Sequence, residues 1–241
     1  MKTSNMLIIA AIIVTLGMLT TYNFSLKAAY QAGEYKNRFL ESEFTEIKNI
    51  ETLNVTAANL LAIVVEPGQK EGIWIRNRIK DRLVLKQQGN DLTIGLTDEA
   101  QKTSKITAED DIVLLINNLS KLNTKAFFLD KTEVTDGKRY GGGVNLKGIK
   151  VGNLELEIGS GTAVSMNKVV LSTLKAMIGL GGDRAVLDLD SANQIEFADF
   201  EIPGASRLLL NNPKIVKTRY NLSDIATVTL NGAALQVIKN R

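Results

Sequence analysis

The sequence predicts an all-β chain, a right-handed parallel β-helix (a solenoid) with a β-rich N-terminal lead-in, preceded by one transmembrane helix. In the second half of the chain, apolar positions recur every 20 or 21 residues, each within a short run of alternating apolar and polar residues. Two strand-like runs per period are typical of stacked coils, which bury their apolar side chains only against neighbouring coils. The handedness follows from the strong right-handed preference of connections between parallel strands. We expect three inward columns: Met166, Leu187, Leu208, Val228; Leu154, Leu174, Ile195, Val216; and Leu156, Ala176, Phe197, Thr218.

The N-terminal segment predicts a membrane anchor. Residues 6 to 22 carry no charged side chain, and as a helix they would extend about 25 Å, which is near the lower limit for spanning a bilayer. The short basic flank at Lys2 favours a signal-anchor over residues 1–22 with a cytoplasmic N-terminus and the rest of the chain outside. A cleaved signal peptide is the alternative, because Ala28 and Ala29 are small, although Lys27 and Tyr30 suit a cleavage site poorly.

The remaining chain is expected to divide into a stalk over residues 23–45 and one β domain over residues 46–241. Period-two alternation predicts strands in 72–79 and a hairpin that turns at 89–91. The polar segment 97–105 is expected to be a loop. The apolar run 111–116 is interpreted as a buried strand, with a helix as the alternative because Asp110 and Asp111 would suit a first turn.

Composition excludes several kinds of function. The 241 residues include no cysteine and no histidine, so disulfides, thiolate chemistry, a lipid-modified N-terminal cysteine and histidine-based catalysis are all excluded. The net charge of +3 is too small to indicate nucleic-acid binding. We therefore expect a protein that is not an enzyme, with no catalytic residues, no cofactor, no metal site and no nucleic-acid partner.

The layout of the chain resembles a known family. A β-rich lead-in (NIETLNVTAANLLAIVVEPG, then DRLVLKQQGNDLTIGL) is followed by DIVLLINNLSKLNTKAFF and then by glycine-punctuated coils of about 20 residues. Over roughly residues 44 to 238 this order is similar to the auto-transporter adhesin head GIN domain family, with Gly143-Val-Asn145 as a loose match to its naming motif. The resemblance implies an extracytoplasmic β-helix of a bacterial cell envelope and brings no catalytic residues. Many relatives resemble lipoproteins, whereas this chain would use its apolar helix as the tether.

An acidic group around one repeat is the first candidate site. Its members are Asp188, Asp190, Glu196, Asp199 and Glu201. Carboxylates on adjacent coils of β-helical enzymes perform acid–base chemistry on polysaccharides. However, Asp188 and Asp190 alternate with leucines, as in any solvated strand face. A solvated face is therefore the favoured interpretation, with calcium or sugar contact and catalysis as alternatives.

A basic run is the second candidate site. It comprises Arg76, Arg78, Lys80, Arg82 and Lys86, which alternate with apolar residues and would lie on one strand face or edge. Such cations bind phosphate groups, anionic lipid or an acidic partner. Charged residues on an outer strand also prevent edge-to-edge association, and we favour this protective role. Arg76, Arg78, Lys80, Arg82, Asp188 and Asp190 are the candidate interaction surface.

These features together predict a membrane-anchored, non-enzymatic cell-envelope protein that mediates protein or glycan interaction in an adhesin-like way, in the periplasm or at the cell surface. One alternative is a structural or accessory subunit of a larger envelope membrane complex, whose helix packs on other helices through Gly17 and the Ala10-Ala11 pair. A second alternative is a polysaccharide-active enzyme that uses the acidic group.

Overall fold

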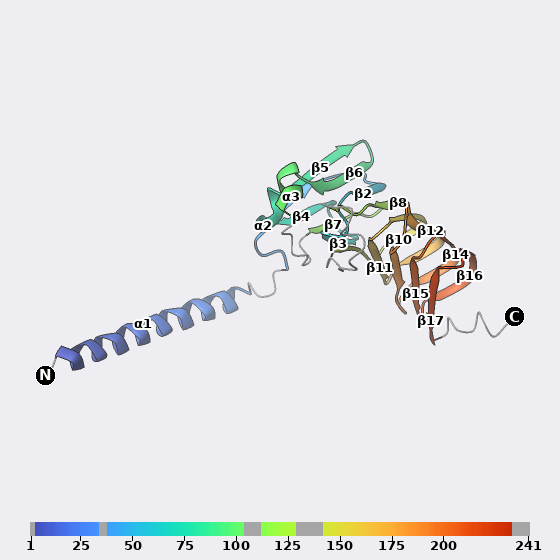
Figure 1. Cartoon of the computed structure of the whole chain (residues 1–241). Helices are drawn as coiled ribbons and strands as arrows, with labels where there is room; N and C mark the ends of the chain where they lie inside the picture. Colours follow the sequence, from blue (N-terminus) through green and yellow to red (C-terminus); the bar gives the residue numbers. More distant parts are fainter. Residues whose placement is uncertain (1–2, 34–37, 104–111, 129–141, 233–241) are drawn as a thin grey trace. The chain divides into compact units, whose positions relative to one another are not determined.

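The computed structural model describes residues 3–33, 38–103, 112–128 and 142–232. The chain forms two compact units, Met1–Glu41 and Ser42–Arg241. The first unit is built on one long helix, and the second is built on β-strands with two short helices (Figure 1).

The helix α1 (Thr3–Ala32) is long and apolar enough to cross a membrane. Over Thr3–Gln31 its mean hydropathy reaches 1.9, and none of it is buried within the protein. The hydroxyl groups of Thr15, Thr20 and Thr21 each donate a hydrogen bond to the carbonyl four residues earlier. These bonds satisfy the polar atoms of the threonines without water, as a lipid environment requires. A secretory signal sequence has the same length and composition. The helix also continues past residue 22 into the segment for which a stalk is predicted.

The second unit contains two large sheets. Sheet A has nine strands in the spatial order β1 (Ser42–Glu46), β4 (Gly72–Arg76), β7 (Ile112–Leu115), β3 (Ala62–Glu66), β9 (Gly143–Lys147), β11 (Ala163–Asn167), β13 (Val186–Leu189), β15 (Arg207–Asn211), β17 (Thr227–Asn231). Sheet B has eight in the order β16 (Lys214–Leu222), β14 (Gln194–Ile202), β12 (Val170–Leu180), β10 (Lys150–Gly159), β8 (Lys121–Thr124), β2 (Thr52–Val55), β6 (Asp91–Leu96), β5 (Leu83–Gln88). From β9 to β17 successive strands alternate between the sheets, and strands of the same sheet pair in parallel.

The prediction of a right-handed parallel β-helix, a closed solenoid, is wrong. The two sheets are separate layers with open edges at β1, β17, β16 and β5, and together they resemble a sandwich. The sheets are also mixed, because the pairs β1–β4, β4–β7 and β5–β6 are antiparallel. A sequence period shows which strands are equivalent in successive repeats. It contains no information on whether the layers join into a tube, because closure depends on the ends of the sheets.

The predicted columns are correct in spacing only in part. Leu187 pairs with Val164, which lies 23 residues earlier, instead of with Met166. Leu174 pairs with Ala198 instead of with Ile195. The connection between β12 and β13 contains extra residues, with left-handed φ angles at Gly181 and Gly182, and it lengthens this repeat. Four predicted steps align: Leu154 with Leu174, Leu156 with Ala176, Leu187 with Leu208, and Leu208 with Val228. Two further steps do not, because Ile195 pairs with Ile215 instead of Val216, and Phe197 pairs with Lys217 instead of Thr218.

The side chains between the two sheets form one continuous apolar core. Phe200 is among the largest fully buried side chains and stacks on Tyr220 of the neighbouring strand, with 5.7 Å between ring centroids. Burial decreases toward the last strands, where Ile215, Val228 and Leu230 are half-buried. Val216, predicted to face inward, is 76% exposed, so this assignment is wrong.

The lead-in strands confirm some of the local predictions. The hairpin forms from β5 and β6 around Gly89, whose φ of 61° suits the turn, and the apolar run yields β7. The strand predicted for 72–79 ends at Arg76, because the next residues form the single turn α2 (Asn77–Lys80). The segment predicted as a loop contains α3 (Asp98–Thr103), where Ala100 donates its amide hydrogen to Thr97 Oγ1 at 3.3 Å.

Candidate ligand groove

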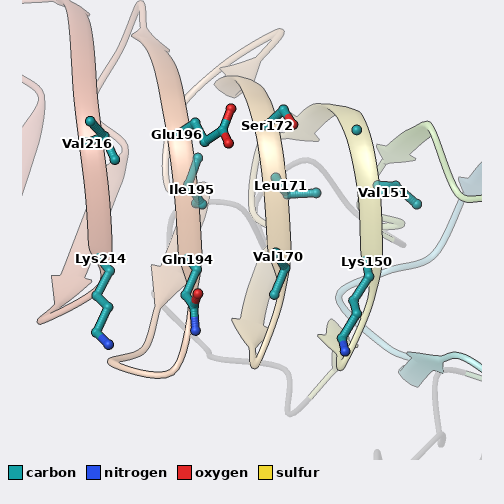
Figure 2. A pocket seen from close by; sticks show the side chains of 11 residues that line it. Lys150, Val151, Val170, Leu171, Ser172, Gln194, Ile195, Glu196, Lys214 and Val216 are labelled. Atoms are coloured by element: carbon teal, nitrogen blue, oxygen red, sulfur yellow. The ribbon is translucent and has the colours of Figure 1, made fainter.

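A groove of about 550 Å³ lies on the outer surface of sheet B. It crosses four adjacent parallel strands, β10, β12, β14 and β16 (Figure 2). Its lining residues are Lys150, Val151, Gly152, Val170, Leu171, Ser172, Gln194, Ile195, Glu196, Lys214 and Val216.

The lining residues form rows that run across the strands. The first row is the set of backbone partners Lys150, Val170, Gln194 and Lys214. The second row is apolar and contains Val151, Leu171 and Ile195. Figure 2 shows the lysine side chains at the two ends of the first row and the apolar residues beside it. At about 4.8 Å per strand, Lys150 and Lys214 lie three strand spacings apart, or roughly 14 Å.

The hollow arises from an irregular step in each strand. Along most of β12 the buried residues are two apart, as in Leu174, Ala176 and Ile178, but Leu171 and Leu174 are three apart. The same step separates Ile195 from Ala198 in β14. Two consecutive residues therefore leave the core side, and the strand must bend locally, as at a bulge. In β10 the corresponding position is Gly152, where a Cβ atom would meet nothing within 4 Å, so the surface stays open.

The groove differs in charge from the rest of the outer face of sheet B. Further along the strands, one row consists of Lys121, Glu155, Lys175, Asp199 and Arg219, which alternate in sign across five strands. A hydrogen bond with Glu157 raises the pKa of Lys121 above its ordinary value, and a hydrogen bond from Arg219 lowers the pKa of Asp199. Each cation of that row has an acidic backbone partner on an adjacent strand. The groove instead contains two lysines and a single carboxylate, Glu196, in the opposite wall.

The structure does not bring the predicted acidic group together. Asp188 belongs to β13 of sheet A and Asp190 follows that strand, whereas Glu196, Asp199 and Glu201 belong to β14 of sheet B. Asp188 Oδ1 accepts a hydrogen bond from Asn211 Nδ2 at 2.7 Å, and Asp190 Oδ1 accepts one from the amide of Ala192 at 3.0 Å.

These contacts give Asp188 and Asp190 a role in holding neighbouring strands and turns. Within the part of the chain that the structure describes, no group of three acidic side chains is placed to hold a metal ion. The five acidic residues belong to one repeat, but its two strands lie in different sheets, so the residues do not form one site.

The basic run does not occupy one strand face. Arg76 ends β4, Arg78 and Lys80 lie in α2, and Arg82 precedes β5. Lys80 Nζ lies 2.5 Å from Glu43 Oε2 of the edge strand β1. The chain reverses at α2, so the period-two spacing that predicted a common face does not apply. Whether Arg76, Arg78, Lys80 and Arg82 bind a partner stays a prediction.

The sequence analysis missed most of the groove. Val170, Gln194 and Lys214 were not singled out, because their common position depends on the register of three strands. One signal was present in the sequence. Leu171 and Leu174, like Ile195 and Ala198, interrupt the period of two, and such an interruption marks a place where a strand changes its exposed face.

No family model matches the chain, and no curated protein matches it. Similar solved structures include a "putative adhesin" from Bacteroides fragilis (9% identity, 79% of this chain and 96% of that chain covered, TM-score 0.47) and a "putative adhesin" from Parabacteroides merdae (12%, 79% and 95%, 0.36). Another is a "putative lipid binding protein" from Parabacteroides distasonis (16%, 78% and 96%, 0.35). These likenesses are distant, and membership of the head GIN domain family stays a resemblance.

Proposed function

We propose that the chain is a membrane-anchored, non-enzymatic, adhesin-like protein of the bacterial cell envelope, and that its extracytoplasmic β body binds a glycan in the groove on sheet B. The groove is the observation that carries this proposal. The tether is the apolar helix α1, which supports attachment to a membrane. The basic residue Lys2 before the apolar segment supports a cytoplasmic N-terminus.

The chemistry of the groove suits a sugar polymer. Gln194, Ser172 and Glu196 offer donors and acceptors for hydroxyl groups, and the lysines add further donors. Val170 and Val216 are the exposed apolar side chains of the lining, and they offer surface for the C–H faces of a sugar ring. All of these side chains come from hydrogen-bonded strands, so the site is largely formed before a ligand arrives, which lowers the entropic cost of binding.

The same lining supports binding without hydrolysis. Most glycosidases place two carboxyl groups about 5 to 9.5 Å apart on either side of the scissile bond. The lining contains one carboxylate, Glu196, and its other polar side chains are lysine, glutamine and serine. A single carboxylate supports recognition of hydroxyl groups but does not supply both the acid and the base.

A glycan array tests the proposal. The full-length chain, reconstituted in zwitterionic nanodiscs, is applied to the array beside Gly152→Phe. The phenyl ring would occupy the groove, and the backbone tolerates it because nothing lies within 4 Å of the new Cβ and φ is not left-handed. The matched control is Thr229→Phe on the exposed face of β17, in sheet A.

We expect the wild type and Thr229→Phe to bind the same glycans and Gly152→Phe to lose them. An array on which the wild type binds no glycan would refute the proposal. Equal binding by Gly152→Phe would also refute it, because the ligand would then occupy another surface.

A further inference from the structure

The two lysines of the groove lie in a row that contains no acidic residue. The backbone partner of Lys150 is Val170, and the partner of Lys214 is Gln194. In the row of sheet B that contains Lys121, Lys175 and Arg219, each cation has an acidic backbone partner. Lys121 also lies 2.6 Å from Glu157 between Nζ and Oε1. Both groove lysines are exposed. The row therefore places positive charge at each end of the groove, roughly 14 Å apart, with neutral side chains between them.

The middle of the groove favours neutral groups, whereas its two ends favour anionic groups. Glu196 lies in the wall between the two lysine strands, beside Ser172. Its carboxylate accepts hydrogen bonds from hydroxyl groups but repels an anion. A ligand that fits both the ends and the middle thus carries anionic groups that are separated by a neutral, hydroxyl-rich unit.

The groove also ends at the border of a sheet. Lys214 and Val216 belong to β16, the edge strand of sheet B, so the described strands do not close that end. A long chain can continue past Lys214 and leave the protein. The site therefore suits the interior of a polymer as well as its end.

We propose that the groove binds an acidic polysaccharide in which anionic sugars alternate with neutral ones. Carboxylate or sulfate groups of two non-adjacent sugars contact Lys150 and Lys214. The intervening neutral sugar lies over Val170, which is exposed, and is hydrogen-bonded by Gln194 and Glu196. This inference rests on the proposed function and names its ligand class.

The test compares hyaluronan oligosaccharides, which alternate a uronic acid with a neutral amino sugar, with their methyl esters. Affinity is measured by isothermal titration for the full-length chain in zwitterionic nanodiscs. We expect the wild type to bind the acid form and to bind the methyl ester at least about tenfold more weakly. The double variant K150Q/K214Q should lose about fivefold to tenfold in affinity for the acid form, since each exposed ion pair contributes modestly.

The control double variant K86Q/K125Q removes two exposed lysines outside the groove and should bind as the wild type does. Raising the salt concentration should weaken binding of the acid form by the wild type more than by K150Q/K214Q. Unchanged circular dichroism spectra would show that the variants fold.

Three results would overturn the inference. Equal binding of acid and ester would mean that charge is not recognised, and the glycan-binding proposal would survive. No binding of either form, together with a blank glycan array, would remove both proposals. Loss of binding to phosphatidylglycerol vesicles in K150Q/K214Q, without any hyaluronan binding by the wild type, would assign the lysines to an anionic lipid.

Discussion

Replacing Asn193 should destabilise the β body by more than one ordinary hydrogen bond. Asn193 lies in the connection between β13 and β14, and its exposed fraction is 0%. Its Nδ2 donates to Met166 O at 2.8 Å and to Asp190 O at 3.1 Å, and its Oδ1 accepts from the Val169 amide at 2.9 Å. One side chain thus joins its own turn to the equivalent turn of the preceding repeat.

The three bonds differ in what their loss costs. In Asn193→Ala the carbonyls of Met166 and Asp190 each keep a backbone partner, the amides of Asp190 and Asn193 respectively. The Val169 amide loses the Asn193 Oδ1 acceptor in a buried site, which costs about 1 to 3 kcal/mol. The two lost donations add roughly 0.5 to 1 kcal/mol each. We therefore expect the free energy of unfolding to fall by about 2 to 5 kcal/mol.

The measurement is urea unfolding of residues 42–241, a separate compact unit, followed by the fluorescence of Trp74, the single tryptophan. Ser191→Ala, an exposed neighbour in the same turn, is the control and should change stability by less than about 0.5 kcal/mol. Asn193→Asp should be worse near neutral pH than in acid, since burial raises the pKa of the new carboxyl and its charged form opposes folding. A loss below 1 kcal/mol in Asn193→Ala would refute the reasoning.

Two further predictions test the register and the electrostatics of the sheets. Because Ser165 and Asp188 are backbone partners about 4.8 Å apart, the double variant Ser165→Cys/Asp188→Cys should form a disulfide on oxidation. The pair Asn167→Cys/Asp188→Cys, which the sequence period alone would favour, should not form a disulfide. A non-reducing gel that shows a disulfide only in the Asn167→Cys/Asp188→Cys variant would disprove the register. The hydrogen bond from Arg219 lowers the pKa of Asp199, so its contribution to stability is present above the unfolded value near about 4 and is lost as the pH falls through the lowered value. Asp199→Asn should therefore destabilise the protein near neutral pH and approach the wild type as the pH falls below about 4, and a constant difference between the two unfolding curves would contradict the ion pair.

Local patterns determined much of the strand content. The alternation around Leu208 and Val228 requires one apolar face, and the structure buries Leu208 and half-buries Val228. Gly89 predicted its turn because few residues other than glycine adopt a left-handed φ there. The same reasoning failed at residues 77–80, where alternation continues in the sequence but the backbone coils into α2, so spacing no longer translates into a shared face.

The site needed information that spacing does not contain. Asp188 and Glu196 are close in sequence but belong to different sheets, because the chain crosses from one layer to the other between them. Lys150 and Lys214 are 64 positions apart (214 minus 150), and the register of three parallel pairs brings them into one row. A shift of one residue in any pair would place one lysine in another row.

The sequence by itself determined that a long apolar helix precedes a repetitive β body whose side chains alternate between core and solvent. These properties follow from hydrophobicity and the period of a strand, which act over a few residues. Only the tertiary structure decided that the strands form two open, mixed sheets, that the acidic residues separate and that the groove lysines align. Closure, layer and register depend on contacts between residues that are far apart in the chain, where one added residue in a turn changes every pairing that follows.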